Sequence, residues 1–236
     1  MSTPAHWDRH ARRFTSEVFD ITRAHAGGVL DRRVAELAST KGTGTLLDAG
    51  CGIGTFARRY GARFARVIAM DFSPAILRRA MAATPAMPNV TWLCADIVEL
   101  PALLRPGVAD LTVSLNVLTY AAPERNADIL RALCTLTARG GHALIVAPSA
   151  ESEAVAGRGA AARSARTVAA TEHVQHRQGL SQRFFTRERL AAAARAAGWR
   201  GAEIEPITYP RGYESVGRAG TGDRAKNYDW LAVLTR

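Results

Sequence analysis

A short glycine-rich run is the first feature of this sequence that can do chemistry. An apolar run at 45–47 leads into it, and it reads Asp48-Ala49-Gly50-Cys51-Gly52-Ile53-Gly54. A glycine-rich turn lets the backbone approach a ligand closely, and the helix that follows points its positively polarised end at that ligand. The run therefore predicts a nucleotide-like binding site at the end of a strand, a feature that many nucleotide-binding folds share.

The spacing of the glycines narrows the class of ligand. The dinucleotide fingerprint GxGxxG would need a glycine at position 55, where this chain has Thr55, and its third glycine, Gly54, comes one residue early. The observed pattern is GxGxG, and the acidic Asp48 precedes it. The spacing therefore disfavours an enzyme that uses NAD.

Two further aspartates follow the next apolar runs of the chain. Asp71 follows the run 67–70, and Asp96 follows the run 90–94. The carboxyl ends of neighbouring parallel strands meet at one edge of a sheet, where ligands bind, and a carboxylate there accepts hydrogen bonds from two hydroxyls. For one such aspartate alone, a helix cap or a turn would be the favoured explanation. With Asp48, three aspartates at successive strand ends favour a binding site.

Together these motifs resemble those of the class I S-adenosylmethionine-dependent methyltransferases, in the broad group of small-molecule enzymes. The matching segments are residues 46–54, 67–74 and 93–97. The resemblance is close over residues 44–148 and loose in the flanks. It implies that the cofactor is S-adenosyl-L-methionine.

The resemblance also implies roles for individual residues. In the family, the glycine-rich loop cradles the methionyl part of the cofactor, the acid matching Asp71 holds the ribose hydroxyls, and the segment that begins at Asn116 lies beside the departing methyl. Phe72 matches the neighbour of the adenine, Asp96 the residue that bonds its amino group, and Ile97 the source of a backbone amide. The predicted cofactor-binding residues are Asp48, Gly50, Cys51, Gly52, Gly54, Asp71, Phe72, Asp96, Ile97 and Asn116.

Residues 116–120 separate the subclasses of this family. Methyltransferases that act on the adenine amino group carry an Asn-Pro-Pro-Tyr-like run here, whereas this segment has no proline. RNA cytosine enzymes need a nucleophilic cysteine, but Cys134 falls on the inward face of a predicted helix, which suits a structural cysteine. Metal-dependent enzymes of the family place several acids near this strand end. The segment has none, so we predict no metal.

Catalytic and acceptor-binding residues are less clearly marked. Tyr120, His173 and His176 are candidates for catalysis. The two histidines lie one helical turn apart, and both a base over the substrate and a solvated loop fit that pattern. His142 is discounted because it starts the predicted fifth strand, far from the carboxyl edge. The candidate substrate-binding residues are the aromatic residues Trp7, Phe14, Tyr120, Tyr209 and Tyr213.

The N-terminal segment 6–14 resembles the family's helix that closes over the cofactor. In that interpretation Arg12 or Arg13 pairs with the carboxylate of the cofactor. An ordinary amphipathic helix with a solvated arginine face explains the same residues equally well, so both interpretations stay open.

Five apolar runs must position these residues, at 45–47, 67–70, 90–94, 111–115 and 143–146. Continuous apolar runs suit parallel strands that are covered on both faces, and the fifth run follows Gly140-Gly141. Helical patterns lie between and after the runs. The first helix starts at Ser73-Pro74 and stops at Pro85, and its inward residues are Leu77, Ala80 and Met81. The second starts at Pro123, and its inward residues are Leu130, Leu133 and Cys134. The third starts at Thr186 and stops at Gly198, and its inward residues are Leu190, Ala194 and Ala197.

The rest of the chain completes the predicted fold. Residues 1–40 have a helical pattern, and two apolar segments at 204–207 and 230–234 lack a helix between them, so we expect them to pair antiparallel. The fold class is α/β, a doubly wound Rossmann-like seven-stranded sheet, mostly parallel with an antiparallel C-terminal strand. One domain spans 1–236, with an N-terminal helical cap (1–43), a cofactor-binding core (44–148), an insertion or lid (149–180), and a C-terminal helix with antiparallel strands (181–236).

Composition limits the class of protein. The 236 residues, 47% of them hydrophobic, suit one domain with a full core. No apolar run reaches the roughly 18 residues that cross a bilayer, the N-terminus does not read as a signal peptide, and the three cysteines form no CxxC pair. We therefore expect a reduced, cytoplasmic protein that does not bind membranes.

The formal net charge of +10 raises the question of a nucleic-acid partner. The chain has only two lysines, its arginines are scattered, and it has no run of five or six basic residues, so an effect of codon composition is favoured over an RNA-binding face. The sequence therefore predicts a methyltransferase acting on an oxygen or nitrogen atom of a small molecule. The alternatives are a tRNA or rRNA methyltransferase and a non-catalytic protein that binds S-adenosylmethionine.

Overall fold

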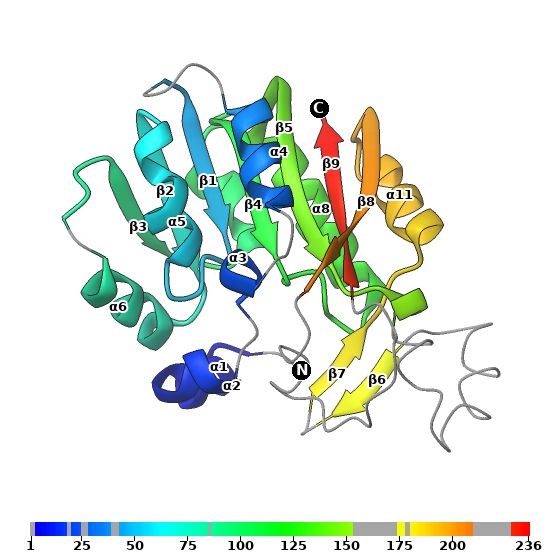
Figure 1. The fold of residues 1–236 in the computed structure, drawn as a ribbon, viewed down its shortest axis with the longest axis horizontal. Coiled ribbons are helices and arrows are strands. Elements are labelled where there is room, and N and C mark those ends of the chain that lie inside the picture. The colour runs from blue at the N-terminus through cyan, green and yellow to red at the C-terminus, as the bar shows by residue number, and fades with distance from the viewer. Residues whose placement is uncertain are drawn as a thin grey trace.

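The computed structural model describes residues 3–17, 20–24, 28–38, 43–84, 86–152, 174–177, 180–209 and 228–236. Its centre is a seven-stranded sheet with helices on both faces (Figure 1). The strand order across the sheet is β3-β2-β1-β4-β5-β9-β8. In chain order these strands are β1 (Thr45–Ala49), β2 (Arg66–Asp71), β3 (Val90–Cys94), β4 (Ala109–Leu115), β5 (Thr137–Ala147), β8 (Gly201–Thr208) and β9 (Tyr228–Thr235).

The direction of the strands confirms the predicted fold class. β1 pairs in parallel with β2 and β4, β2 with β3, and β4 with β5. β9 is antiparallel to both of its neighbours, β5 and β8. The carboxyl ends of β1 to β5 therefore meet at one edge of the sheet, and the strand order reverses between β1 and β4, which is where open α/β sheets bind ligands.

Two hydrophobic layers cover the faces of the sheet (Figure 1). On one face, α4 (Val29–Leu37) and α5 (Thr55–Tyr60) bury Leu30, Val34 and Phe56. On the other face, α8 (Pro123–Leu136) and α11 (Arg187–Ala196) bury Leu133 and Leu190, and the short α7 (Leu100–Leu103) packs beside α8. Helices on both faces explain why the inner strands read as continuous apolar runs rather than as alternating ones.

The predicted helix starts are correct, but one predicted core residue is wrong. α6 (Pro74–Ala83) is capped by Ser73, whose Oγ accepts from the Ile76 N–H at 3.2 Å. Met81, which we predicted to face inward, is 51% exposed, and Ile76 is buried instead. The buried face of α6 is centred on Ile76, Leu77 and Ala80, so Met81 lies at its solvent-exposed border.

β5 begins earlier than predicted. It starts at Thr137 and continues through Gly140-Gly141, which the sequence pattern presents as a turn before the strand. The pairing between β4 and β5 shifts register between Ala109 and Leu111. A Cβ on Gly141 would lie 2.8 Å from the Asp110 carbonyl oxygen, so this close approach requires glycine. The two glycines therefore form an irregular stretch of strand rather than its boundary.

The N-terminal helical pattern is divided into short pieces. They are α1 (Pro4–His10), a 3-10 turn at Ala11–Arg13, α2 (Phe14–Glu17), α3 (Ile21–Ala24) and α4. α4 begins after Gly28, whose φ of 62° is left-handed and interrupts any continuous helix. α1 and α2 lie beside α6, off the end of the sheet (Figure 1).

A hairpin that the sequence pattern did not indicate begins in the predicted insertion (149–180) and ends just beyond it. β6 (Val174–Arg177) pairs antiparallel with β7 (Leu180–Arg183). Residues 153–173 of the predicted lid, and most of the loop 208–228, lie outside the described residues. None of the helices in the described ranges is long and apolar enough to cross a membrane.

Candidate functional site

The loop that follows β1 is shaped by glycines. Gly50, Gly52 and Gly54 all have positive φ, between 54° and 79°, a conformation that side chains with a Cβ rarely adopt. The N–H groups of Gly50 and Cys51 both donate to the Met70 carbonyl at 2.9 and 2.8 Å, which ties the loop to β2. A Cβ on Gly50 would lie 2.5 Å from Cγ2 of Val117, so only glycine fits there.

Asp71 ends β2 and supports this loop directly. Its Oδ2 accepts from the Gly52 N–H at 3.1 Å, and its Oδ1 accepts from the Ser73 N–H at 2.9 Å. The side chain is 7% exposed. Burial raises the pKa of Asp71 to about 6, against the opposing effect of these backbone hydrogen bonds. Each carboxylate oxygen has a second lone pair, so Asp71 still has acceptors for a ligand.

Asp48, near the end of β1, is the least satisfied polar group of the site. Among the described residues, its Oδ2 is the one buried side-chain oxygen or nitrogen without a hydrogen-bond partner. Burial, and then repulsion from Asp71, raise the pKa of Asp48 to about 7. A buried, unpartnered acceptor of this kind costs stability unless a ligand satisfies it.

Asp96 follows β3 and begins the short 3-10 helix Ile97–Glu99. Its Oδ1 accepts from the Val98 N–H at 3.1 Å, and its Oδ2 is ion-paired with Arg125 from the first turn of α8. Phe72 and Ile97 line the same cavity as Asp96 and add apolar side chains to it. This end of the site therefore suits a planar base with a polar edge.

The N-terminal segment packs against the glycine loop. The Phe14 ring lies 3.0 Å from the position that a Cβ on Gly52 would occupy, and the Trp7 and Phe14 ring centroids are 6.3 Å apart. Asp8 anchors the segment to α6, because its Oδ1 accepts from Ser73 Oγ at 2.5 Å and from the Ala75 N–H at 3.1 Å. Arg79, which also lies in α6, adds a second anchor by donating to the backbone carbonyl of Arg12 at 2.9 Å.

The segment after β4 forms the opposite wall of the site. Asn116 has a φ of 60°, the only positive φ of a non-glycine residue in the described ranges. Such strain persists only where the surroundings enforce it, and it gathers at functional sites. Asn126 holds the segment by accepting from the Tyr120 N–H at 3.2 Å and donating to the Tyr120 carbonyl at 2.7 Å.

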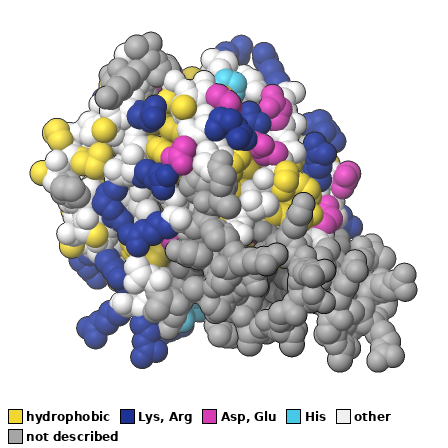
Figure 2. All heavy atoms as spheres, in the orientation of Figure 1, with side chains coloured by type: hydrophobic (Ala, Val, Ile, Leu, Met, Phe, Trp, Pro, Cys, Tyr) yellow, Lys and Arg dark blue, Asp and Glu magenta, His cyan; other side chains and the backbone are white. Residues whose placement is uncertain are grey.

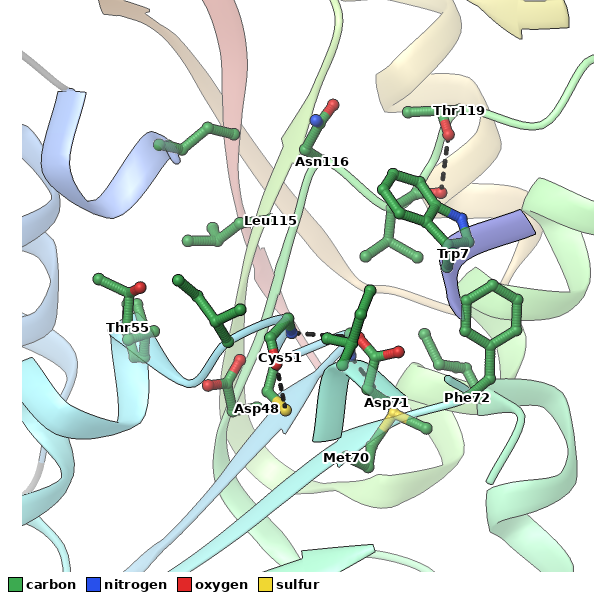
Figure 3. A pocket seen from close by; sticks show the side chains of 18 of the residues that line it. Trp7, Asp48, Cys51, Thr55, Met70, Asp71, Phe72, Leu115, Asn116 and Thr119 are labelled. Atoms are coloured by element: carbon green, nitrogen blue, oxygen red, sulfur yellow. Dashed lines mark hydrogen bonds between the residues drawn. The ribbon is translucent and has the colours of Figure 1, made fainter. Parts of the chain in front are cut away.

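These parts enclose one cavity of about 1040 Å³, including its open mouth. In the view of Figure 3, Asp48 and Thr55 lie at one end, Asp71 in the middle, and Phe72 and Trp7 at the other end. The predicted residues that line the cavity are Trp7, Phe14, Asp48, Gly50, Cys51, Gly52, Asp71, Phe72, Asp96, Ile97, Asn116 and Tyr120. Gly54 is not on the cavity wall. It caps α5 behind the loop.

The cavity also includes residues that sequence reasoning missed. They are polar or charged and come from separate segments: Asp20, Thr22, Thr55 and Arg125. Thr55 carried a signal, since it replaces the expected third glycine of a dinucleotide site, and its Oγ1 donates to Asp20 Oδ2 at 2.8 Å. Asp20 and Arg125 carried none, because each reads as an ordinary charge near a helix start.

Some predicted residues lie elsewhere. Tyr209 does not line the cavity, and its hydroxyl donates to Asp229 Oδ2 at 2.8 Å. Arg12 and Arg13 are exposed and are absent from the cavity wall. His176 lies in β6, whereas His173 and Tyr213 fall outside the described residues. Within the described part of the chain, no group of three His, Cys, Asp or Glu residues could hold a metal ion.

The sheet order, the glycine loop and the aspartates at three strand ends define the class I methyltransferase fold. Residues 46–141 match the family model described as a methyltransferase domain. Over these residues the chain therefore resembles known methyltransferase domains.

Known relatives are distant in sequence but close in fold. A phosphoethanolamine N-methyltransferase from Triticum aestivum is 24% identical over 140 residues, which cover 58% of this chain and only 28% of that protein. The chain thus aligns with little more than a quarter of this curated relative.

Two solved structures share the fold over almost the full chain. A Haloferax volcanii methyltransferase in complex with its activator Trm112 superposes with a TM-score of 0.67 at 18% identity, covering 98% of this chain and 94% of that one. The 1,6-didemethyltoxoflavin-N1-methyltransferase of Burkholderia thailandensis, with its substrate and S-adenosylhomocysteine bound, gives a TM-score of 0.64 at 16% identity, covering 100% and 92%.

Proposed function

We propose that this protein transfers the methyl group of S-adenosylmethionine to an oxygen or nitrogen atom of a small molecule. The observation that carries the proposal is the cavity, which combines a glycine loop, three strand-end aspartates and an aromatic cover. The same proposal includes one domain over 1–236, with a cap (1–43), a cofactor-binding core (44–148), an insertion (149–180) and a C-terminal part (181–236).

The charge of the cavity suits this cofactor, which carries a sulfonium, an ammonium and one carboxylate. Asp20, Asp48 and Asp71 all line the cavity, and the buried Oδ2 of Asp48 is an acceptor available to a ligand. In the proposed binding mode, Asp48 faces the cationic methionyl end and Asp71 accepts from the ribose hydroxyls. Phe72, Ile97 and Asp96 then hold the adenine.

Methyl transfer requires the acceptor atom to be aligned with the methyl group and water to be excluded from the site, and it depends less on acid–base groups. Bound S-adenosylmethionine supplies an electrophilic methyl group on a cationic sulfur. The aromatic rings of Trp7 and Phe14 cover the loop and exclude water, and they favour a cationic centre nearby. Asn116, Thr119 and Tyr120 form the wall that remains for the methyl acceptor, and Tyr120 stays the described candidate for a catalytic role.

The relatives and the surface support a small acceptor. Two of the similar proteins are N-methyltransferases named for small molecules, phosphoethanolamine and 1,6-didemethyltoxoflavin. On the face that Figure 2 shows, basic side chains are spread over several regions, and acidic side chains lie among those in the upper part.

Calorimetry with two adenosine-containing ligands tests the cofactor assignment. We expect S-adenosylmethionine to bind and NAD to give no measurable heat, because the GxGxG loop closes one residue earlier than a dinucleotide loop. If the protein bound NAD but not S-adenosylmethionine, the proposal would be rejected. Release of S-adenosylhomocysteine with a panel of small amines, phenols and alcohols then distinguishes an enzyme from a protein that only binds the cofactor.

Bulk RNA provides the second test. We expect weak association with tRNA that weakens steeply as the salt concentration rises. Scattered arginines bind phosphates and release their counterions, but they do not recognise a particular RNA structure. Incubation with labelled S-adenosylmethionine at physiological salt should leave the RNA unlabelled. Incorporation of labelled methyl groups into RNA would instead favour the tRNA or rRNA methyltransferase alternative.

A further inference from the structure

An ion pair joins α8 to the loop after β3 at the adenine end of the proposed site. Arg125 Nη2 is paired with Asp96 Oδ2, and the two side chains are only 27% and 29% exposed. Both residues line the cavity. The pair is therefore part of the wall that a ligand meets, not a contact on the outer surface.

The pair fixes both oxygens of one carboxylate. Asp96 Oδ1 accepts from the Val98 N–H at 3.1 Å, and Oδ2 accepts from Arg125. With an anchor on each oxygen, the carboxylate plane cannot rotate freely. Each oxygen keeps another lone pair, and those lone pairs have a fixed direction relative to the cavity.

Arg125 is itself held in place. Its Cζ lies 5.3 Å from the centroid of the Tyr120 ring, and Asn126, which is 3% exposed, holds the Tyr120 backbone through two hydrogen bonds. Arg125 stands in the first turn of α8, where the helix dipole disfavours a cation. The contacts with Asp96 and Tyr120 therefore explain why a cation stands at this position, which the helix dipole alone would disfavour.

We propose that Arg125 is a positioning residue that sets the selectivity of the site for adenine. It holds Asp96 in the orientation in which that carboxylate accepts the exocyclic amino group of the base. The inference rests on the proposed function, since it takes the adenine to lie between Phe72 and Asp96. The competing explanation is a structural ion pair that only joins α8 to the Ile97–Glu99 turn.

Two ligands separate these explanations without any methyl acceptor. They are S-adenosylhomocysteine and its 6-deamino analogue, in which hydrogen replaces the exocyclic amino group. We expect the unchanged protein to bind the first about 10- to 100-fold more tightly, because a carboxylate that loses its donor is left unpaired. In Arg125→Gln the ratio should fall to about threefold or less, with little change for the analogue.

Matched variants complete the experiment. Arg131→Gln removes a more exposed arginine–aspartate ion pair, the i,i+3 pair with Asp128 within α8, and should leave the ratio unchanged. Asp96→Asn should lower the ratio as far as the double variant Arg125→Gln/Asp96→Asn does, and Arg125→Lys, which keeps the charge, should recover part of it. If Arg125→Gln weakened both ligands equally, or neither, the positioning role would be wrong.

The design keeps the two proposals apart. If the unchanged protein bound neither ligand, the proposed function itself would fail. If it bound S-adenosylhomocysteine with a ratio that Arg125→Gln does not alter, only the role of Arg125 would fail. If Arg125→Gln did not fold, Arg125→Lys would carry the test through the same ratio.

Discussion

Replacing Asp71 with alanine should weaken the binding of S-adenosylhomocysteine by roughly 30- to 1000-fold, or about 2–4 kcal/mol. The carboxylate is the proposed acceptor for both ribose hydroxyls, and hydrogen bonds to a charged group are the strong ones. It also holds the Gly52 N–H, so its loss loosens the loop that surrounds the ligand. Calorimetry on the folded variant measures the change in dissociation constant.

The same variant should also lose stability, which the position of Asp71 at a strand end did not suggest. Alanine leaves the N–H groups of Gly52 and Ser73 without their acceptor in a buried site, at a cost of about 1–3 kcal/mol. Thr186→Ala is the matched control, because it removes the cap of α11 and should lower the melting temperature by a similar mechanism without changing affinity. A lower melting temperature for Asp71→Ala with unchanged affinity would mean that the ribose site is misplaced.

Replacing Asp48 with asparagine should stabilise the free protein above pH 7 and weaken cofactor binding. The folded state raises the pKa of Asp48 from 3.8 to about 7, so between these values it retains a proton that the unfolded chain has released. The contribution of Asp48 to stability is therefore complete below about pH 4 and is lost as the pH rises through about 7. Near pH 8 the free energy of unfolding of Asp48→Asn should therefore exceed that of the unchanged protein by about 2–4 kcal/mol.

Urea unfolding at pH 5 and pH 8 tests this expectation. The unchanged protein should be less stable at pH 8, and Asp48→Asn should reduce that difference without abolishing it, because Asp71 titrates in the same direction. Binding of S-adenosylmethionine should weaken about tenfold, since the ligand loses a charged acceptor. Equal stability of the two proteins at pH 8, with equal affinity, would show that Asp48 neither strains the free site nor faces the ligand.

The sequence predicts the cofactor half of the site well because local patterns encode it. Parallel strands buried on both faces read as apolar runs, and the residues after the runs must lie at the carboxyl edge. Asp48, Asp71 and Asp96 therefore come together in the structure from positions far apart in the chain. The glycine spacing adds the shape of the loop, since three positive φ values need three residues without a Cβ.

Other features depend on tertiary contacts that no local pattern encodes. Arg125 meets Asp96 only because α8 packs on the Ile97–Glu99 turn. The start of β5 was misjudged because Gly140-Gly141 reads as a turn, whereas pairing with β4 extends the strand back to Thr137. The burial of Ile76 instead of Met81 likewise follows from packing, because Ile76 lies in a hydrophobic cluster with Ala11 and Ile53.

The position of β9 has a consequence for synthesis of the protein on the ribosome. β9 lies between β5 and β8, so β8 joins the sheet only through a strand that is made after it. Until residues 228–235 leave the ribosome, the edge of β5 has no partner along His142–Ala147, a largely apolar stretch. Such an open edge is a template for pairing with other nascent chains. The growing polypeptide therefore passes through a stage prone to aggregation that ends only when its last strand is inserted.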